Sequence, residues 1–141
     1  MPVDALVSAE VEIQVPFHDL DPLEVVWHGH HVKYFEVARC ALFDRIGYNF
    51  SQMKASGYVW PVIELFVRYA CPLRFGQTVR VRADLVECEC RLKVVYLIRD
   101  AQTGRRLAKG HTIQVAVSAV AGELSLRSPE VLLRKLGMDS A

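Results

Sequence analysis

The sequence FHDLDPLEVVWHGHHVKYFEVAR, from Phe17 to Arg39, decides how the rest of the 141-residue chain can fold. It joins a polar loop, with two aspartates and a proline, to the start of a helix. From about His30, apolar residues recur at three- and four-residue steps, the period of one helix face. Gly47 is suited to the C-terminal end of that helix. The apolar stripe consists of Phe35, Leu42, Phe43 and Ile46.

Strand-like segments lie on both sides of this predicted helix. Residues 9–16 alternate apolar and polar side chains and end at a proline, which predicts a half-buried strand. One strand, one long helix and then several consecutive strands predict an α+β layer with a five-stranded antiparallel sheet. A short terminal helix is expected with Ser128 as its N-cap, followed by Pro129 and Glu130. The four later strand segments are predicted at residues 58–71, 78–90, 91–99 and 105–117.

A sheet of this kind needs more cover than one helix provides. One helix protects only one face, so the other face and a sheet edge are left to be covered. Association of two copies of the chain covers such surfaces with no additional protein. The sequence therefore predicts a homo-oligomer.

Composition narrows the class of protein. The length is that of one domain with a sizeable core, here expected to span residues 1–141. A formal net charge of +1 gives no electrostatic reason to expect nucleic acid or membrane partners. No apolar run approaches the roughly 18 residues of a membrane span, and the first residues do not resemble a signal peptide. A cytoplasmic location is expected.

The loop before the helix combines groups that suit acyl transfer. Asp21 lies on a turn stiffened by Pro22, a few residues before the unpaired amides of the first helical turn. Such amides stabilise negative charge and can bind the oxyanion of a carbonyl under attack. A carboxylate beside them can attack a thioester or activate water, since a thiolate leaves with little acid assistance. Alternatively, Asp19 and Asp21 only form the turn and cap the helix.

The same stretch resembles the hotdog-fold acyl-CoA thioesterases of the 4-hydroxybenzoyl-CoA thioesterase, YbgC and FadM type. The likeness extends over about residues 9–135 and implies a five-stranded antiparallel sheet wrapped around one long helix. It also implies a homodimer or homotetramer that binds an acyl-CoA substrate at the dimer interface, with no cofactor. The matching motifs are Asp19-Leu-Asp21, Val25-Val26-Trp27-His28 and Glu36-Val-Ala-Arg39.

The resemblance assigns roles to individual positions. Asp21 matches the catalytic carboxylate, as base or nucleophile, and His28 matches the residue whose backbone N–H polarises the thioester carbonyl. Val26 and Trp27, in the same motif, are expected to contact substrate. Two further positions have alternative interpretations. Glu64 is an outward-facing strand residue or a pocket acid from the facing subunit, and Arg91 is a solvated residue or a phosphate contact.

Two departures from the family pattern affect the interpretation. Glu24 replaces the family's glycine, so the loop is expected to differ. Gly29-His30-His31 replaces the usual Tyr or Asn, which resembles thioesterases of aryl-polyene and related pathways that act on acyl carrier proteins. A hotdog that only binds acyl ligands is a further alternative. The histidines could also suggest metal, but their spacing is not that of a closed site and none is expected.

Overall fold

A five-stranded antiparallel sheet forms the body of the protein. The computed structural model describes residues 5–137. The strand order is β1-β4-β5-β6-β3, and every neighbouring pair is antiparallel. The predicted fold class is therefore confirmed. The strands of this sheet are β1 (Val7–Gln14), β3 (Val62–Tyr69), β4 (Thr78–Glu87), β5 (Leu92–Asp100) and β6 (Arg106–Gln114).

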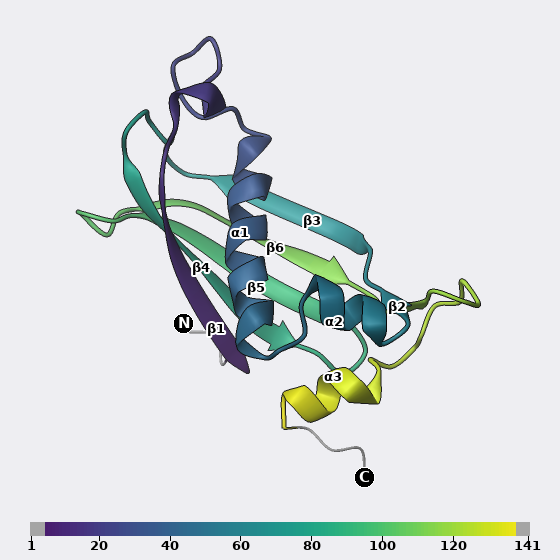
Figure 1. The fold of residues 1–141 in the computed structure, drawn as a ribbon. Helices are drawn as coiled ribbons and strands as arrows, with labels where there is room; N and C mark the ends of the chain where they lie inside the picture. Colours follow the sequence, from purple (N-terminus) through teal and green to yellow (C-terminus); the bar gives the residue numbers. More distant parts are fainter. Residues whose placement is uncertain (1–4, 138–141) are drawn as a thin grey trace.

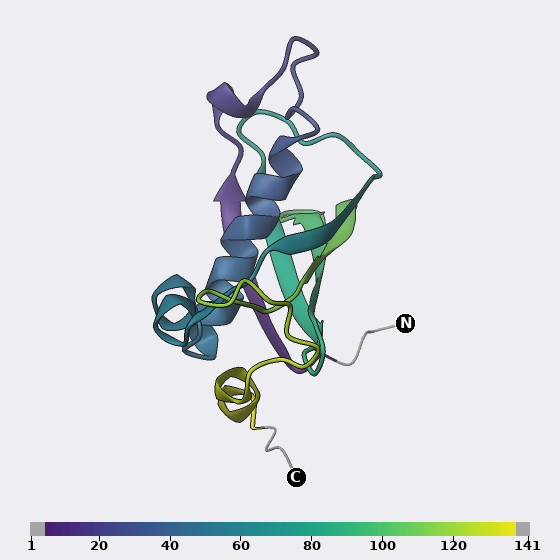
Figure 2. The ribbon, with the colours of Figure 1, turned by 90° about the vertical axis from the view of Figure 1, so that its right-hand side faces the viewer.

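The long helix α1 (His30–Arg45) lies along one face of this sheet (Figures 1 and 2). The helix packs against β1 and β4. Its Phe35 ring stacks on Tyr96 of β5, with ring centroids 4.4 Å apart. Close approach to β6 depends on Gly110, where a Cβ atom would lie 2.2 Å from the Phe66 carbonyl oxygen and 2.7 Å from the Phe35 ring. The helix can therefore pack closely here only because position 110 has no side chain.

The central strands have the alternation that the sequence predicts. One side of each strand is buried beneath α1, and the other side carries more polar residues. Burial of these apolar side chains is the main term that stabilises the domain. The buried residues are Val79, Val81, Ala83 and Leu85 in β4 and Leu92, Val94, Tyr96 and Ile98 in β5.

Two of the predicted strand segments divide, and the last helix begins later than predicted. The segment 58–71 breaks at Trp60 and Pro61, and the segment 105–117 breaks after β6. The pieces cut off, β2 (Tyr58–Val59) and β7 (Val117–Ser118), form a separate two-stranded sheet beside α2 (Phe50–Ala55). The terminal helix α3 (Glu130–Lys135) has Pro129 at its N-cap position. The Ser128 hydroxyl is buried without a hydrogen-bond partner in the described chain, so the predicted serine cap is wrong.

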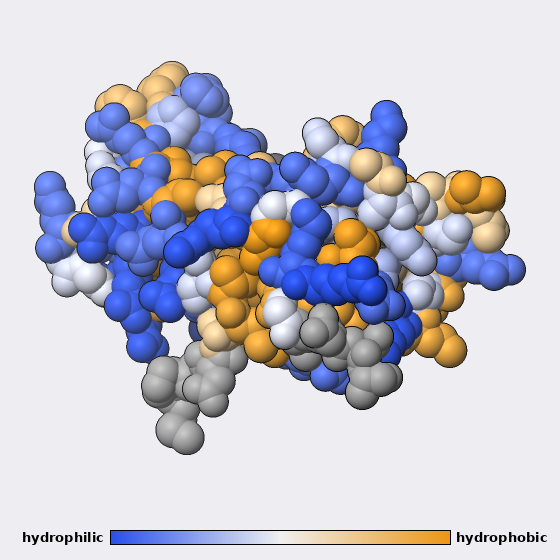
Figure 3. All heavy atoms as spheres, turned by 60° about the horizontal axis from the view of Figure 1, so that its bottom comes forward, coloured by the Kyte–Doolittle hydropathy of each residue, from blue (hydrophilic) through white to orange (hydrophobic). Residues whose placement is uncertain are grey.

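Strand β3 is an uncovered edge. Most of its residues are exposed, although many are large and apolar. An apolar edge strand with unpaired backbone groups is a site of association with another chain. Figure 3 shows further apolar residues among charged ones at the end of the molecule that carries α3. Between residues 5 and 137 there is no helix long and apolar enough to cross a membrane. The exposed large apolar residues of β3 are Val62, Ile63, Leu65, Phe66 and Tyr69.

Candidate active site

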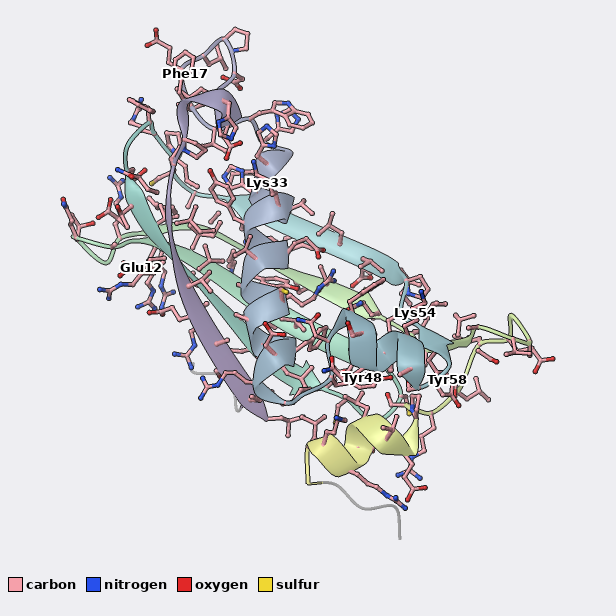
Figure 4. All side chains as sticks on the ribbon, in the orientation of Figure 1. Glu12, Phe17, Lys33, Tyr48, Lys54 and Tyr58 are labelled. Carbon is pink, nitrogen blue, oxygen red and sulfur yellow. The ribbon has the colours of Figure 1, made fainter. Side chains whose placement is uncertain are left out.

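Asp19 anchors the loop to the helix. The residue is 1% exposed, and its carboxylate accepts hydrogen bonds from Lys33 Nζ and, at 2.7 Å, from the Tyr34 hydroxyl. Figure 4 shows Lys33 on the first turns of α1, next to the loop that carries Phe17. Burial alone would raise the pKa of the Asp19 carboxyl. The hydrogen bonds from Lys33 and Tyr34 and the lysine charge outweigh burial and hold this pKa below its ordinary value.

Asp21 lies in the next turn of the loop and keeps part of its carboxylate available. Its Oδ1 accepts a hydrogen bond from the Leu23 amide at 2.8 Å, and its backbone carbonyl accepts from the Glu24 amide at 2.9 Å. No hydrogen bond reaches Oδ2 from any residue in the range 5–137. The turn therefore holds the carboxylate by one oxygen and leaves the other free to act on a ligand.

Glu24 adopts a left-handed backbone conformation that favours glycine. Its φ is +66°, and it is the one non-glycine residue of the described chain with a positive φ. A side chain in this region costs roughly 1–2 kcal/mol relative to the ordinary helical region. The turn therefore forms with a glutamate at this position, although a side chain in this conformation lowers the stability of the fold. Whether the loop differs from that of the family because Glu24 replaces glycine stays a prediction.

Replacing Glu24 by glycine should therefore stabilise the protein. We expect Glu24→Gly to raise the free energy of unfolding by about 0.5–1 kcal/mol, because relief of strain exceeds the added flexibility of the unfolded chain. Urea denaturation measures this change, and thioester hydrolysis assays show whether the strained turn also affects activity. Leu23→Gly is the matched control in the same turn. That substitution should destabilise, and equal effects of the two variants would contradict the strain argument.

Two backbone hydrogen bonds fix the position of the residues that precede α1. The Val26 amide donates to the Leu73 carbonyl at 2.9 Å, and the Trp27 amide donates to the Asp19 carbonyl at 3.0 Å. The following amides, of His28 and Gly29, donate no hydrogen bond within the described residues. Free N–H groups at the start of a helix favour negative charge. The sequence Val26–Gly29 thus presents two unpaired donors at the N-terminus of a 16-residue helix.

Asp21 and His28 line one cavity of about 320 Å³. The cavity lies between the loop, the start of α1 and the end of β3. Its wall is mostly apolar, as is usual for small-molecule sites, with a few polar groups among the apolar ones. The structure thus brings together the two residues predicted to be catalytic, along with Val26. The other lining residues are Leu23, Val25, His31, Tyr69, Ala70, Cys71 and Pro72.

His31 is a polar residue of this cavity that the sequence suggested only as a possible metal ligand. It is 2% exposed, and neither ring nitrogen has a hydrogen-bond partner of good geometry in the described structure. Its ring packs edge-on against Tyr69, with centroids 4.7 Å apart. Burial lowers the pKa of the imidazole, and the backbone of Trp27 and His28 offsets this only partly. The lowered pKa favours the neutral imidazole, which can donate one hydrogen bond and accept another.

Tyr69 joins the end of β3 to the start of the helix. Its hydroxyl donates to the His28 carbonyl oxygen at 2.5 Å, and burial raises the pKa of this phenol. This bond fixes the peptide that follows His28, whose N–H belongs to Gly29. A shift of the edge strand β3 would therefore also move the peptide that carries the unpaired Gly29 amide.

The other predicted substrate contacts lie outside this cavity. Trp27 is 46% exposed and packs its ring against those of His28 and His30. Glu64 lies on β3, and its Oε2 forms a hydrogen bond with His111 Nε2 at 2.8 Å. Arg91 pairs with Glu87 at the turn between β4 and β5, near α3 and at the other end of the sheet (Figure 1). The proposed roles of Glu64 and Arg91 thus require a second subunit and stay predictions.

Side chains of the usual metal-binding types do not converge. Within residues 5–137 there is no group of three His, Cys, Asp or Glu side chains that could hold a metal ion. The histidines near the helix start instead contact aromatic rings, as His30 contacts Trp27.

Comparisons with known proteins point to one family. Residues 15–136 match the thioesterase-like superfamily. Over 128 residues, the chain is 30% identical to the Synechocystis protein sll0410, which has a provisional esterase name, covering 90% of this chain and 77% of that one. It is 33% identical over 67 residues to YneP of Bacillus subtilis, provisionally named an acyl-CoA thioesterase, covering 48% and 49%.

A solved structure with similar sequence has the same fold. The hypothetical protein TT1821 of Thermus thermophilus superposes with a TM-score of 0.81 and 31% identity, covering 92% of this chain and 97% of that chain. The long family match, the sheet order and the position of the helix point to one conclusion. This chain belongs to the thioesterase-like superfamily and is a thioester hydrolase with the hotdog fold.

Proposed function

We propose that this protein hydrolyses acyl-CoA thioesters in the cavity shared by Asp21 and His28. One observation supports the proposal above all: a half-free carboxylate and two unpaired amides lie at the same helix N-terminus. The acyl-CoA class agrees with the name of the Bacillus relative, which is similar to half of this chain.

The carboxylate supplies the attacking group. Asp21 either abstracts a proton from a water molecule or attacks the thioester carbon itself, forming an anhydride that water then hydrolyses. In both routes, the carbonyl carbon becomes tetrahedral, and collapse of this intermediate breaks the carbon–sulfur bond. The departing thiolate needs no strong general acid.

The start of the helix stabilises the charge that develops. When the carbonyl carbon becomes tetrahedral, its oxygen becomes an oxyanion. The His28 amide, with Gly29 beside it, donates to that oxygen, and the helix dipole adds to the effect. One such donor contributes about 2.7–4 kcal/mol to transition-state stabilisation in known enzymes.

The proposed active form is a homodimer joined through β3. The exposed apolar residues of β3 and its unpaired backbone groups support this arrangement. A two-fold axis beside this strand would pair it antiparallel with its own copy and extend the sheet across both subunits. Because Tyr69 at the end of β3 contacts the cavity, pairing would also bring a second subunit close to each active site.

A charge introduced on β3 should prevent this association. We expect Ile63→Lys, at a position 61% exposed in the single chain, to shift the protein to monomer and to lower hydrolysis at least about tenfold. Sedimentation velocity and thioesterase assays measure the two effects. Leu126→Lys, exposed in the loop before α3, is the matched control and should leave both unchanged. A dimer that persists in the β3 variant would exclude this interface.

A substrate panel tests the function itself. Purified protein is assayed with aromatic and aliphatic acyl-CoAs and with the same acyl groups on an acyl carrier protein. Turnover of CoA thioesters supports the proposal, whereas turnover only on the carrier protein would replace CoA with the carrier. Absence of hydrolysis of both would contradict it.

A further inference from the structure

Two consecutive peptide groups carry the amides of His28 and Gly29, which donate no hydrogen bond inside residues 5–137. The carbonyl of each of these peptides accepts a hydrogen bond. In the first peptide, the Trp27 carbonyl accepts from the His30 amide at 2.9 Å, a contact within one turn of the chain. In the second, the His28 carbonyl accepts from the Tyr69 hydroxyl at 2.5 Å. The peptide that carries the Gly29 amide is therefore held by a side chain from β3.

The bond to the His28 carbonyl also decides where the Gly29 N–H points. A peptide group is planar and trans, so its C=O and its N–H point in opposite directions. His28 lies before α1, which begins at His30, and the tyrosine hydroxyl fixes the peptide at this entry to the helix. Hydrogen bonds in a chain polarise one another, so a donor on the carbonyl makes the N–H of the same peptide a stronger donor. Tyr69 thus sets both the direction and the strength of the Gly29 amide.

Close packing on both sides limits the movement of this peptide. A Cβ atom at Gly29 would lie 2.3 Å from Cζ3 of the Trp27 ring, so the ring occupies the space that a side chain at position 29 would need. On the other side, the Tyr69 ring packs edge-on against buried His31, with centroids 4.7 Å apart. The hydroxyl that binds the peptide is therefore carried by a ring that is itself held in place.

We propose that Tyr69 is a positioning residue, which orients the Gly29 amide as a second donor to the oxyanion of the thioester under attack. This inference rests on the proposed thioesterase function. The Tyr69 hydroxyl acts through the peptide, whereas its ring forms part of the cavity wall. The carbonyl oxygen gains negative charge only as the carbon becomes tetrahedral, so a well-aimed amide stabilises the transition state more than the bound substrate. Loss of the hydroxyl should therefore lower kcat rather than raise KM.

Tyr69→Phe tests this role, because it removes the hydroxyl and keeps the ring that lines the cavity and packs against His31. We expect kcat for acyl-CoA hydrolysis to fall by about 10- to 100-fold, since misdirecting one donor costs somewhat less than removing it. KM should change by less than about twofold, because the wall of the cavity is retained. Tyr58→Phe, which removes a hydroxyl on β2 outside this cavity, is the matched control and should keep the wild-type kcat.

Two unreactive CoA analogues separate positioning from a general structural role. One is a trifluoromethyl ketone thioether of CoA, whose carbonyl carbon readily becomes tetrahedral by addition of water. The other is a plain alkyl thioether of CoA, which has no carbonyl. By calorimetry, Tyr69→Phe should weaken binding of the ketone by at least about tenfold and that of the alkyl thioether by less than about twofold. Wild-type affinity for the alkyl thioether would also show that the variant is folded.

The outcomes distinguish this inference from the proposed function. An unchanged kcat in Tyr69→Phe, with acyl-CoA hydrolysis by the wild type, would overturn the inference and leave the thioesterase function standing. Equal weakening of both analogues would also overturn it, because it would indicate a general loss of cavity shape. If the wild type hydrolysed no thioester, the proposed function would fail, and selective weakening of the ketone would still support the positioning of the Gly29 amide by Tyr69.

Discussion

Replacing Asp21 by asparagine is expected to lower kcat/KM for acyl-CoA hydrolysis by about 10²–10⁴-fold. Asparagine cannot act as a base or nucleophile here, but its side-chain oxygen can still accept the hydrogen bond that Asp21 receives from the Leu23 amide. The turn should therefore survive, and the free energy of unfolding should stay within about 0.5 kcal/mol of wild type. Release of free thiol measures hydrolysis, and urea denaturation measures stability.

The neighbouring acid provides the control for this change. Glu24 is exposed and lies outside the cavity, so Glu24→Gln removes a negative charge from the same loop without touching the proposed chemistry. We expect that variant to retain activity. Full activity of Asp21→Asn would remove the proposed mechanism, and equal losses in both variants would indicate a general electrostatic effect of the loop.

Most of the fold could be predicted because its signals are local and periodic. The stripe of Phe35, Leu42 and Phe43 identifies α1, and these residues are buried as expected. Alternation in β4 and β5 likewise identifies both strands and their inner faces. Division of the segment 58–71 was missed, although Pro61, which cannot donate to a ladder, lies at the break. Gly110 was missed because only the arrangement of α1 over β6 requires a glycine there.

The candidate site was predictable where one continuous motif forms it. Asp21, Val26 and His28 lie within eight residues of sequence, and all three line the same cavity. Tyr69 comes from a separate strand, β3, and the sequence has no local signal that it lines this cavity. His31 appeared only as a possible metal ligand, because its burial against Tyr69 depends on tertiary structure. The local pattern gives Asp19 and Asp21 the same turn and cap roles, and only the resemblance assigns catalysis to Asp21, whereas the structure buries Asp19 and holds Asp21 by one carboxylate oxygen.

Because the two aspartates differ in their surroundings, a second large effect is expected, on stability: Asp19→Asn should destabilise the protein by about 2–4 kcal/mol at pH 7. The change is chemically the same as Asp21→Asn and lies two residues away. It would, however, weaken the contact with Lys33 and leave the buried Tyr34 hydroxyl facing an amide rather than a carboxylate. Urea denaturation should therefore distinguish the two variants, and comparable stability of the two would contradict the anchoring role of Asp19.

The pH dependence of stability tests whether the charge of Asp19 accounts for the loss of stability expected in Asp19→Asn. The pKa of Asp19 in the folded protein lies below its ordinary value of 3.8. Its ionised form therefore contributes stability that is fully present above that value and is lost as the pH falls through the lower folded pKa. The difference in unfolding free energy between wild type and Asp19→Asn should be constant from pH 7 to about pH 5 and should narrow below about pH 4. A difference that does not change over this range would mean that packing, rather than charge, is responsible for the loss.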